Sequence, residues 1–525
     1  MCGRFAAESG APRLPPLAPD RHTLFAGLYR SYLRCRRTKR RTMNALRFEF
    51  RAELNLLELT DELAEGRYRP SRSIRFAVER PKMREIVAAA FRDRVVHHYL
   101  VERLERIFEP IFIHDSYACR VGKGVHAALE RVREFLRSGT ENGRRPLYSL
   151  HLDVKNFFMT IDHRTLVNMV EERLVKEARR VGAHGMRPDT LERDPSDSGA
   201  RRAPLPFLFK LAKTIIHHNH MTDRLDKDDL RILERIPPHK TLLHAPFGKG
   251  LPVGNLTSQF FANVYLNELD QFCKHVLKCR YYVRYCDDFL ILDRDPERLA
   301  VLREEIRGFL RQRLSLELNT RYAAIVPVTS GIDFIGYIIR PDYVLVRRRT
   351  VNNLRARLEE FQRTQTTERP GMLVIRNNPA AVARLRGVLA SYTGHFLWAD
   401  THRLRRSLFQ RYPFIRAFFR MDAQGAPVFK RGIRPEGRTL RGQCRSLAGR
   451  YPGAAVYVQV GRRYHRPGLN HGGAVKGVGA ARLQQAVRER LKAGLPVVIA
   501  WQTGRRYGQL LERLPAVFLL PRRDS

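Results

Sequence analysis

The pattern of hydrophobic and polar positions predicts a chain in which helices and strands are mixed. Apolar residues recur every three to four positions, as on one face of a helix, over residues 23–64, 256–277, 350–363 and 379–411. Runs rich in apolar, aromatic and β-branched residues indicate strands at 147–154 and 280–292, and residues 71–135 combine short strands with helices. These patterns predict a fold of the α+β class.

Three segments without periodicity interrupt this pattern. Residues 1–22 are rich in Pro and Ala, residues 186–206 have the composition of an irregular loop, and a Gly- and Pro-rich break covers residues 422–435. We therefore predict a basic N-terminal extension at 1–45, a large α+β region at 46–345, a helical region at 346–428 and a small α/β region at 429–525.

The charge of the chain narrows the class of function. The 525 residues include 96 Lys or Arg and 53 Asp or Glu, which gives a formal net charge of +43. An excess of this size favours a polyanionic partner, and nucleic acid over a membrane surface. We expect no membrane-spanning segment, because no run of 18 apolar residues is present. Seven Cys without a CxxC pair predict reduced thiols and a cytoplasmic location.

A cluster of six cations interrupts the first helical region. Its members are Arg34, Arg36, Arg37, Lys39, Arg40 and Arg41. Such a run is often only the solvated face of a helix. With the charge of the whole chain in view, we favour contact with the phosphates of a nucleic acid.

Two adjacent acids, Asp287 and Asp288, form the sharpest local feature. They lie within Tyr-Tyr-Val-Arg-Tyr-Cys-Asp-Asp-Phe-Leu-Ile-Leu at 281–292. Two aromatic and β-branched runs around a short polar break predict a β-hairpin with the acids at its turn. A lone Asp-Asp pair is most often a solvated turn. Acids beside apolar strands are costly to bury unless a cation neutralises them.

A third acid, Asp153, lies near the end of another predicted strand. Residues 148–154 alternate, so that Asp153 points away from the face that carries Leu150 and Leu152. Two strands that end in acids can place carboxylates around a pair of divalent ions. Hard oxygen ligands favour two Mg²⁺ ions, or Mn²⁺, over Zn²⁺. On its own, however, an Asp at a strand end is unremarkable.

The segment 250–263 reads Gly-Leu-Pro-Val-Gly-Asn-Leu-Thr-Ser-Gln-Phe-Phe-Ala-Asn. A turn that contains Gly lets the backbone approach a ligand closely. Asn255 or Thr257 would then cap a helix with an apolar face. An ordinary entry from loop to helix is the simpler interpretation of this segment taken alone.

In this order, the three motifs resemble a reverse transcriptase. The resemblance continues upstream in Arg-Pro-Lys-Met-Arg-Glu-Ile at 80–86 and downstream in Gly-Ile-Asp-Phe-Ile-Gly-Tyr at 331–337, and it covers residues 46–420. Each motif is weak alone, but the ordered set is specific. The resemblance implies a right-hand polymerase, with fingers and an antiparallel palm sheet in residues 46–345 and a helical thumb in 346–428.

The form Val-Gly-Asn-Leu-Thr-Ser-Gln is similar to that of reverse transcriptases from diversity-generating retroelements. Most reverse transcriptases carry Gln at the position of Val253 and Ser-Pro at the positions of Ser258 and Gln259. The retroelement enzymes copy a template-repeat RNA into cDNA with errors concentrated at template adenines. The resemblance therefore implies an error-prone RNA-directed DNA polymerase that uses deoxynucleoside triphosphates, with an accessory retroelement protein as a possible partner.

The resemblance also implies roles for individual residues. Asp153, Asp287 and Asp288 would be the catalytic acids and, with the carbonyl of Val154, the ligands of two Mg²⁺ or Mn²⁺ ions. Phe158 would exclude a ribose 2′-hydroxyl, although a core Phe is the simpler interpretation. The residues implied at the nucleotide site are Lys82, Arg84, Phe158, Val253, Gly254 and Gln259. Because the aliphatic Val253 cannot hydrogen-bond to the incoming nucleotide, we expect it to contribute to errors opposite adenine.

The C-terminal region carries a second resemblance. Residues 450–464 and 493–503 resemble the N-terminal mismatch-recognition domain of MutS proteins, but the Phe-x-Glu element of that domain is replaced here by Arg463 and His465. Residues 430–525 contain 20 Lys or Arg against 4 Asp or Glu. We therefore expect this MutS-like domain to bind RNA or duplex rather than to read mismatches, with Arg462 and Arg463 among its contacts.

Two alternatives remain open. The first is another prokaryotic reverse transcriptase, of the intron-like or phage-defence kind. The second is a non-catalytic RNA-binding scaffold that retains the polymerase fold, and the presence of all three acids argues against it.

Overall fold

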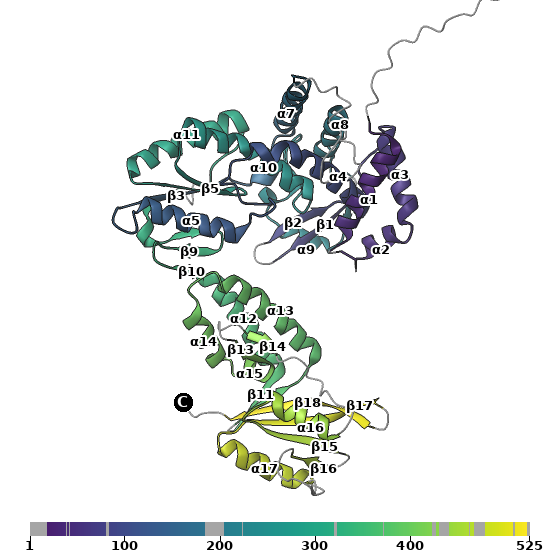
Figure 1. The fold of residues 1–525 in the computed structure, drawn as a ribbon, viewed down its shortest axis with the longest axis vertical. Coiled ribbons are helices and arrows are strands. Elements are labelled where there is room, and N and C mark those ends of the chain that lie inside the picture. The colour runs from purple at the N-terminus through teal and green to yellow at the C-terminus, as the bar shows by residue number, and fades with distance from the viewer. Residues whose placement is uncertain are drawn as a thin grey trace, which may run out of the picture. The chain divides into compact units, whose positions relative to one another are not determined.

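The computed structural model describes residues 18–521 except 38, 41, 80–82, 184–203, 223, 320–322, 371, 423–426, 430–439, 461–462, 467–477 and 508–509. The chain divides into two compact units, Met1–Ile335 and Gly336–Ser525 (Figure 1). The described part contains both helices and strands throughout, which confirms the prediction of a mixed fold.

The first unit begins with three helices and continues with alternating strands and helices. Its helices are α1 (Arg21–Arg36), α2 (Met43–Glu49), α3 (Ala52–Ala64), α4 (Phe91–Phe108), α5 (Val125–Gly139), α6 (Phe157–Thr160), α7 (His163–Ala183), α8 (Leu205–Ile216), α9 (Leu230–Glu234), α10 (Leu256–Gln271) and α11 (Pro296–Leu314). Its strands are β1 (Ser73–Val78), β2 (Arg84–Ala88), β3 (Tyr148–Asp153), β4 (Arg224–Asp226), β5 (Tyr281–Tyr285), β6 (Asp288–Asp293), β7 (Ile325–Pro327) and β8 (Ile332–Phe334).

The central sheet of this unit has the strand order β5-β6-β3-β7, and each adjacent pair is antiparallel. The strands at 147–154 and 280–292 are therefore confirmed, and they are neighbours. Figure 1 shows α11 and α5 on opposite sides of this sheet. Leu150, Leu152 and Ile291 are buried in one core together with the apolar face of α11. Burial on both sides holds the strand ends in fixed positions.

A second, three-stranded sheet has the order β2-β1-β4. The buried guanidinium of Arg75 on β1 donates to Glu85 on β2 at 2.7 Å. The same carboxylate accepts from the Thr241 hydroxyl at 2.5 Å and from the Leu242 backbone N–H at 2.7 Å. This buried carboxylate therefore fastens the β1–β2 hairpin to the segment that precedes residue 250, and its three donors offset the cost of its burial.

The second unit contains a helical part and a sheet. Its helices are α12 (Arg348–Gln365), α13 (Pro379–Phe396), α14 (His402–Arg411), α15 (Ile415–Phe418), α16 (Leu440–Arg450) and α17 (Ala480–Lys492). Its strands are β9 (Tyr337–Ile339), β10 (Val344–Val346), β11 (Thr366–Arg369), β12 (Met372–Arg376), β13 (Phe419–Met421), β14 (Pro427–Phe429), β15 (Ala455–Val460), β16 (Arg463–His465), β17 (Val497–Tyr507) and β18 (Leu510–Pro521).

The sheet of the second unit joins two regions that the sequence analysis kept apart. Its order is β11-β12-β18-β17-β15-β16, and β12 pairs with β18 from Met372↔Pro521 to Arg376↔Val517. Strands β11 and β12 lie inside the range that we expected to be helical. They complete the edge of the C-terminal sheet, because β18 would otherwise expose one row of backbone N–H and C=O groups.

None of the described helices combines the length and the hydropathy that a membrane-spanning segment requires. The six described cysteines are all free thiols.

Buried histidines hold part of the first unit together. His97 on α4 lies 3.4 Å from the Thr257 hydroxyl, and His220, which follows α8, lies 2.8 Å from the Ser73 hydroxyl. Burial, together with the neighbouring histidines, lowers the pKa of both His97 and His220 to about 3. Both side chains are therefore neutral in the folded protein at every pH above that value.

This arrangement predicts that the first unit loses stability in mild acid. The unfolded chain binds a proton at each histidine below a pKa near 6.5, whereas the folded chain does so only near 3. The stabilisation is complete above pH 6.5 and falls as the pH is lowered toward 3, by about 2 kcal/mol per histidine at pH 5. Urea unfolding followed by far-UV circular dichroism measures it, and His97→Gln should reduce the pH dependence.

Tryptophan fluorescence supplies an internal control for this measurement. The chain has two Trp, Trp398 and Trp501, and both lie in the second unit. The midpoint of the fluorescence transition should therefore be the same in the His97→Gln variant and in the parent. An unfolding midpoint of the first unit that stays constant from pH 7.5 to 5 contradicts the prediction.

Candidate active site

The β3–β6 pairing brings the three predicted acids to one end of the central sheet. Asp153 is the last residue of β3, and it is directly opposite Asp288, the first residue of β6. Asp287 belongs to the two-residue turn between β5 and β6, and its carbonyl accepts from the Val154 backbone N–H at 3.3 Å. Residues separated by more than 130 positions in sequence therefore form one acidic group.

The electrostatics of this group reflect crowding. Burial, and then the carboxylates of Asp288 and Asp153, raise the pKa of Asp287 to about 6. Burial also raises the pKa of Asp153, with Asp288 adding to the effect. Three like charges in a partly buried place disfavour full ionisation, so a cation at this position would be bound favourably.

The donor chemistry fits Mg²⁺ or Mn²⁺. Carboxylate oxygens from Asp153, Asp287 and Asp288, and the carbonyl of Val154, are hard ligands of the kind that these ions take. The described residues contain no preassembled group of three or more His, Cys, Asp or Glu side chains that could hold a metal. The fit therefore rests on the ligand type and on the crowding of the three acids.

Two neighbours of these acids were not anticipated from the sequence. Asn319 donates from its side-chain amide to Asp153 at 3.0 Å and from its backbone N–H to the Asp153 carbonyl at 2.8 Å. His151 on β3 lies 3.5 Å from the Asp288 carboxylate. His151 could have been found from strand periodicity, because it shares a face with Asp153. Asn319 carries no such sequence pattern, since its position follows from the bridge between Val154 and Leu318.

Phe158 and Val253 lie in one small apolar cluster. Both are partly buried, and both pack against the buried residues Val87, Met159 and Leu242. Backbone hydrogen bonds support the cluster, with Leu251 N–H donating to the Phe158 carbonyl at 2.7 Å and Val87 N–H to the Val253 carbonyl at 3.0 Å. The structure therefore brings together two residues of the predicted nucleotide site that are 95 positions apart.

The turn that follows Val253 has little room for a side chain. Gly254 has φ +117°, and a Cβ at this position would lie 2.8 Å from Ile86. Asn255 is at the N-cap of α10, but its side chain accepts from the Ala89 backbone N–H at 2.9 Å and makes no capping bond. Gln259 is exposed on the first turns of α10. The amide of Asn255 thus ties this turn to the end of β2 instead.

The remaining cationic predictions have different outcomes. Arg84 is exposed at the start of β2, whereas Lys82 lies outside the described residues.

Arg37 and Arg40 are exposed, but Arg36 pairs with Glu49, and burial lowers the pKa of Lys39. Arg463 is exposed on β16, and Arg41 and Arg462 lie outside the described residues. Part of the N-terminal cluster is therefore committed to contacts within the protein.

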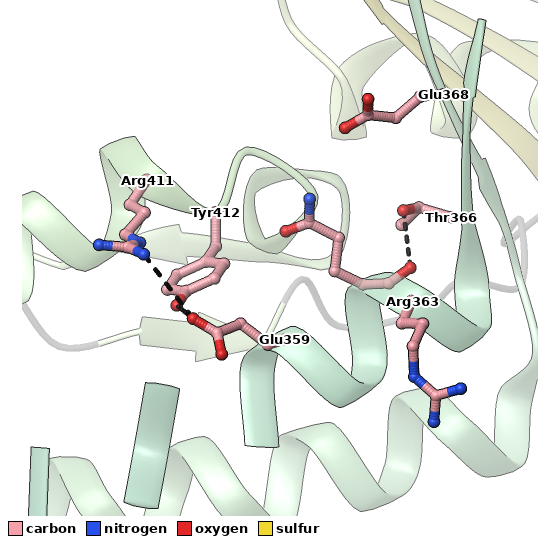
Figure 2. Close-up of a pocket in the computed structure, with 7 residues that line it drawn as sticks. Glu359, Arg363, Thr366, Glu368, Arg411 and Tyr412 are labelled. Carbon is pink, nitrogen blue, oxygen red and sulfur yellow. Dashed lines mark hydrogen bonds and ion pairs between the residues drawn. The ribbon is translucent and has the colours of Figure 1, made fainter. Parts of the chain in front are cut away.

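A separate cavity of about 400 Å³ lies in the second unit (Figure 2). Glu359 there accepts from the Tyr412 hydroxyl at 3.0 Å and lies 3.7 Å from Arg411. Its lining residues are Glu359, Gln362, Arg363, Thr366, Glu368, Arg411 and Tyr412. None of these is a predicted site residue, and their charges are already mixed and partly paired, so this cavity is not the candidate active site.

Comparison with known proteins gives coarse similarities. No protein-family model matches the chain. The chain is 25% identical to protein YkfC of Escherichia coli over 330 residues. This alignment covers 56% of this chain and 74% of YkfC. The chain is also 25% identical over 316 residues to the group II intron-encoded protein LtrA of Lactococcus lactis, which covers 55% of this chain and 50% of LtrA. The chain thus spans about half the length of LtrA.

Among solved structures, the chain is similar to telomerase from Candida albicans in complex with a fragment of telomeric RNA, with 12% sequence identity and a TM-score of 0.36. The alignment covers 67% of this chain and 57% of the telomerase chain. A TM-score this low does not establish a shared fold. The curated relatives support a reverse transcriptase-like family, and they leave its subtype open.

The contact between Asn319 and Asp153 predicts an effect on cation binding. Asn319→Ala removes a donor that favours the charged form of Asp153. Loss of such a supporting group weakens metal binding by about 10- to 100-fold. Titration with Mn²⁺, followed by electron paramagnetic resonance, measures this affinity.

Glu317→Gln is the matched control, because Glu317 lies on the same segment and pairs with the exposed Lys155 at 3.3 Å. Its Mn²⁺ affinity should match that of the parent. Equal affinities for the Asn319→Ala variant and the parent would show that Asn319 does not support the site.

Proposed function

We propose that this chain is an RNA-directed DNA polymerase that extends a primer 3′-hydroxyl with deoxynucleotides and releases pyrophosphate. The observation that carries the proposal is the meeting of Asp153, Asp287 and Asp288 where β3 and β6 pair. Three adjacent carboxylates, of which burial and like charge raise the pKa of Asp153 and Asp287, are a costly arrangement for a structural turn, and they suit a site that binds cations. The similarity to intron-encoded proteins supports this class of activity at a coarse level.

The three carboxylates would hold two Mg²⁺ ions, with the Val154 carbonyl as a further ligand. Such ions, when bound, supply the Lewis acidity that activates a hydroxyl and stabilises a pyrophosphate leaving group. Asn319 donates to Asp153, which favours the charged form of this carboxylate and orients it. The β3–β6 pairing fixes the acids before any ligand arrives, which lowers the cost of assembling the site.

The cluster formed by Phe158 and Val253 would bind the incoming nucleotide. The Phe158 ring would occupy the space that a ribose 2′-hydroxyl needs, and so select deoxynucleotides. Arg84, exposed on β2, would neutralise charge on the triphosphate as the leaving group forms. Lys82 is proposed for the same task from the sequence alone.

We further propose that the polymerase belongs to a diversity-generating retroelement and copies a template-repeat RNA with errors at adenines. The supporting observation is the position of Val253. Its aliphatic side chain packs against Val87, Met159 and Leu242, and so offers no hydrogen bond to a base pair. The basic C-terminal sheet, with Arg463 exposed, would add affinity for RNA or for the cDNA duplex.

A second candidate is an intron-type reverse transcriptase, which the similarity to LtrA favours. It requires the same chemistry at the same acids. The two candidates differ in template and in fidelity, so the error spectrum separates them.

The proposal predicts that Asp287→Asn abolishes primer extension on an RNA template. The substitution removes a negative charge from the acidic group with little change in size, and the rate should fall on the order of 10³-fold, or about 4 kcal/mol in activation free energy. Single-nucleotide extension under template–primer excess gives the rate. Glu58→Gln, which removes one negative charge from the exposed side of α3, is the control and should retain parental activity. Equal rates for Asp287→Asn and the parent would exclude catalysis at this site.

The finer proposal predicts a change in fidelity. Val253→Gln restores an amide that can contact the nascent base pair, so misincorporation opposite template adenine should fall by about 10-fold, or roughly 1.4 kcal/mol of added discrimination. Sequencing of the cDNA products measures the errors at each template base, and the rates opposite the other three bases serve as internal controls. An unchanged spectrum would remove Val253 as a cause of adenine errors.

A further inference from the structure

The largest fully buried side chain of the described residues is the guanidinium of Arg284, on β5. It makes two hydrogen bonds to Asp270 on α10, from Nε to Oδ1 at 2.7 Å and from Nη2 to Oδ2 at 2.6 Å. Both side chains have no exposed surface. Burial alone would lower the pKa of Arg284, but Asp270 outweighs this effect and raises it, so that the guanidinium stays charged.

A buried ion pair of this kind is weak evidence for a contribution to stability. The cost of taking both charges out of water is commonly as large as their attraction, and well-packed apolar residues of similar size serve stability equally well. The ion pair is therefore expected to have a role besides stability, and the other hydrogen bonds of Arg284 indicate what that role is.

Those donors point toward the turn that carries Asp287. Nη1 of Arg284 donates to the Cys286 carbonyl at 3.0 Å and to the Asn263 side-chain oxygen at 3.2 Å. The backbone of Arg284 is also fixed, since its N–H donates to the Asp115 carbonyl at 2.9 Å. A rigid guanidinium thus connects α10 to the residue immediately before the acids.

The turn needs such support because its backbone is strained. Tyr285 pairs with Asp288, so Cys286 and Asp287 alone connect β5 to β6. Cys286 has φ +59°, a left-handed conformation that a residue with a side chain adopts only at an energetic cost. Strained residues of this kind persist where the surroundings hold them in place.

We propose that the Arg284–Asp270 pair is a positioning device, which holds the left-handed turn at Cys286 and thereby sets where the Asp287 and Asp288 carboxylates lie. Arg284 acts through the turn and does not touch substrate. The inference rests on the proposed function in one respect, because it takes the Asp287 and Asp288 carboxylates to be catalytic. The planar fork of Arg reaches Asp270 and the Cys286 carbonyl together, whereas the single ammonium of Lys does not.

The test compares Arg284→Lys with Tyr282→Phe. Lys keeps the positive charge beside Asp270 but cannot also hold the turn. Tyr282 donates to the same carboxylate at 2.7 Å, so the removal of its hydroxyl perturbs the buried network while Arg284 keeps its hydrogen bond to the Cys286 carbonyl. Hydrogen–deuterium exchange over residues 285–289 reports on the turn without requiring activity, and single-nucleotide extension gives kcat and KM for the deoxynucleotide.

We expect Arg284→Lys to speed exchange at 285–289 and to lower kcat by about 10- to 100-fold, with KM within about twofold of the parent, because a misplaced reacting group slows chemistry more than binding. Tyr282→Phe should lower stability and leave kcat within about twofold. Should Arg284→Lys not fold, the double variant R284M/D270L, which buries no charge, carries the same expectation.

The experiment distinguishes a failure of the positioning role from a failure of the proposed function. Unchanged exchange and kcat in Arg284→Lys overturn the positioning role while the parent is active, and so does an equal loss of kcat in Tyr282→Phe. A parent without activity overturns the proposed function instead, and exchange at 285–289 then still decides whether Arg284 holds the turn.

Discussion

Repulsion among three carboxylates is the constraint on which the rest of the candidate site depends. Burial raises the pKa of Asp153 and of Asp287, and the neighbouring carboxylates, including that of Asp288, add to the effect. A fold tolerates such an arrangement only if strong local structure imposes it. Here it is imposed by two paired strands with buried faces and by a hydrogen-bonded turn.

Much of this site could be predicted from local patterns. The alternation at residues 148–154 and the apolar runs around Asp287 and Asp288 predict two strands that end in acids, and both strands exist. The resemblance to a family implied that the three acids act together, but the pairing that places Asp153 opposite Asp288 was not predicted. Periodicity specifies which side a residue faces, but it does not specify which strands become neighbours.

The supporting contacts could not be predicted in the same way. Asn319 reaches Asp153, and Arg284 reaches the Cys286 carbonyl, only because distant segments meet in the folded chain. The same holds for strands β11 and β12. Residues 366–376 were interpreted as part of a helical region, and their strand pairing with β18 depends on residues almost 150 positions later. Non-local pairing overrides local preference in each case.

The most direct test of the account is a crystal structure of the chain grown with MnCl₂, with diffraction data collected at the manganese absorption edge. The account predicts anomalous density within about 2–2.3 Å of oxygens from Asp153 and Asp287, with Asp288 adjacent. The account would be contradicted if no manganese peak lies at this end of the β3–β6 pair, or if manganese binds only elsewhere in the chain.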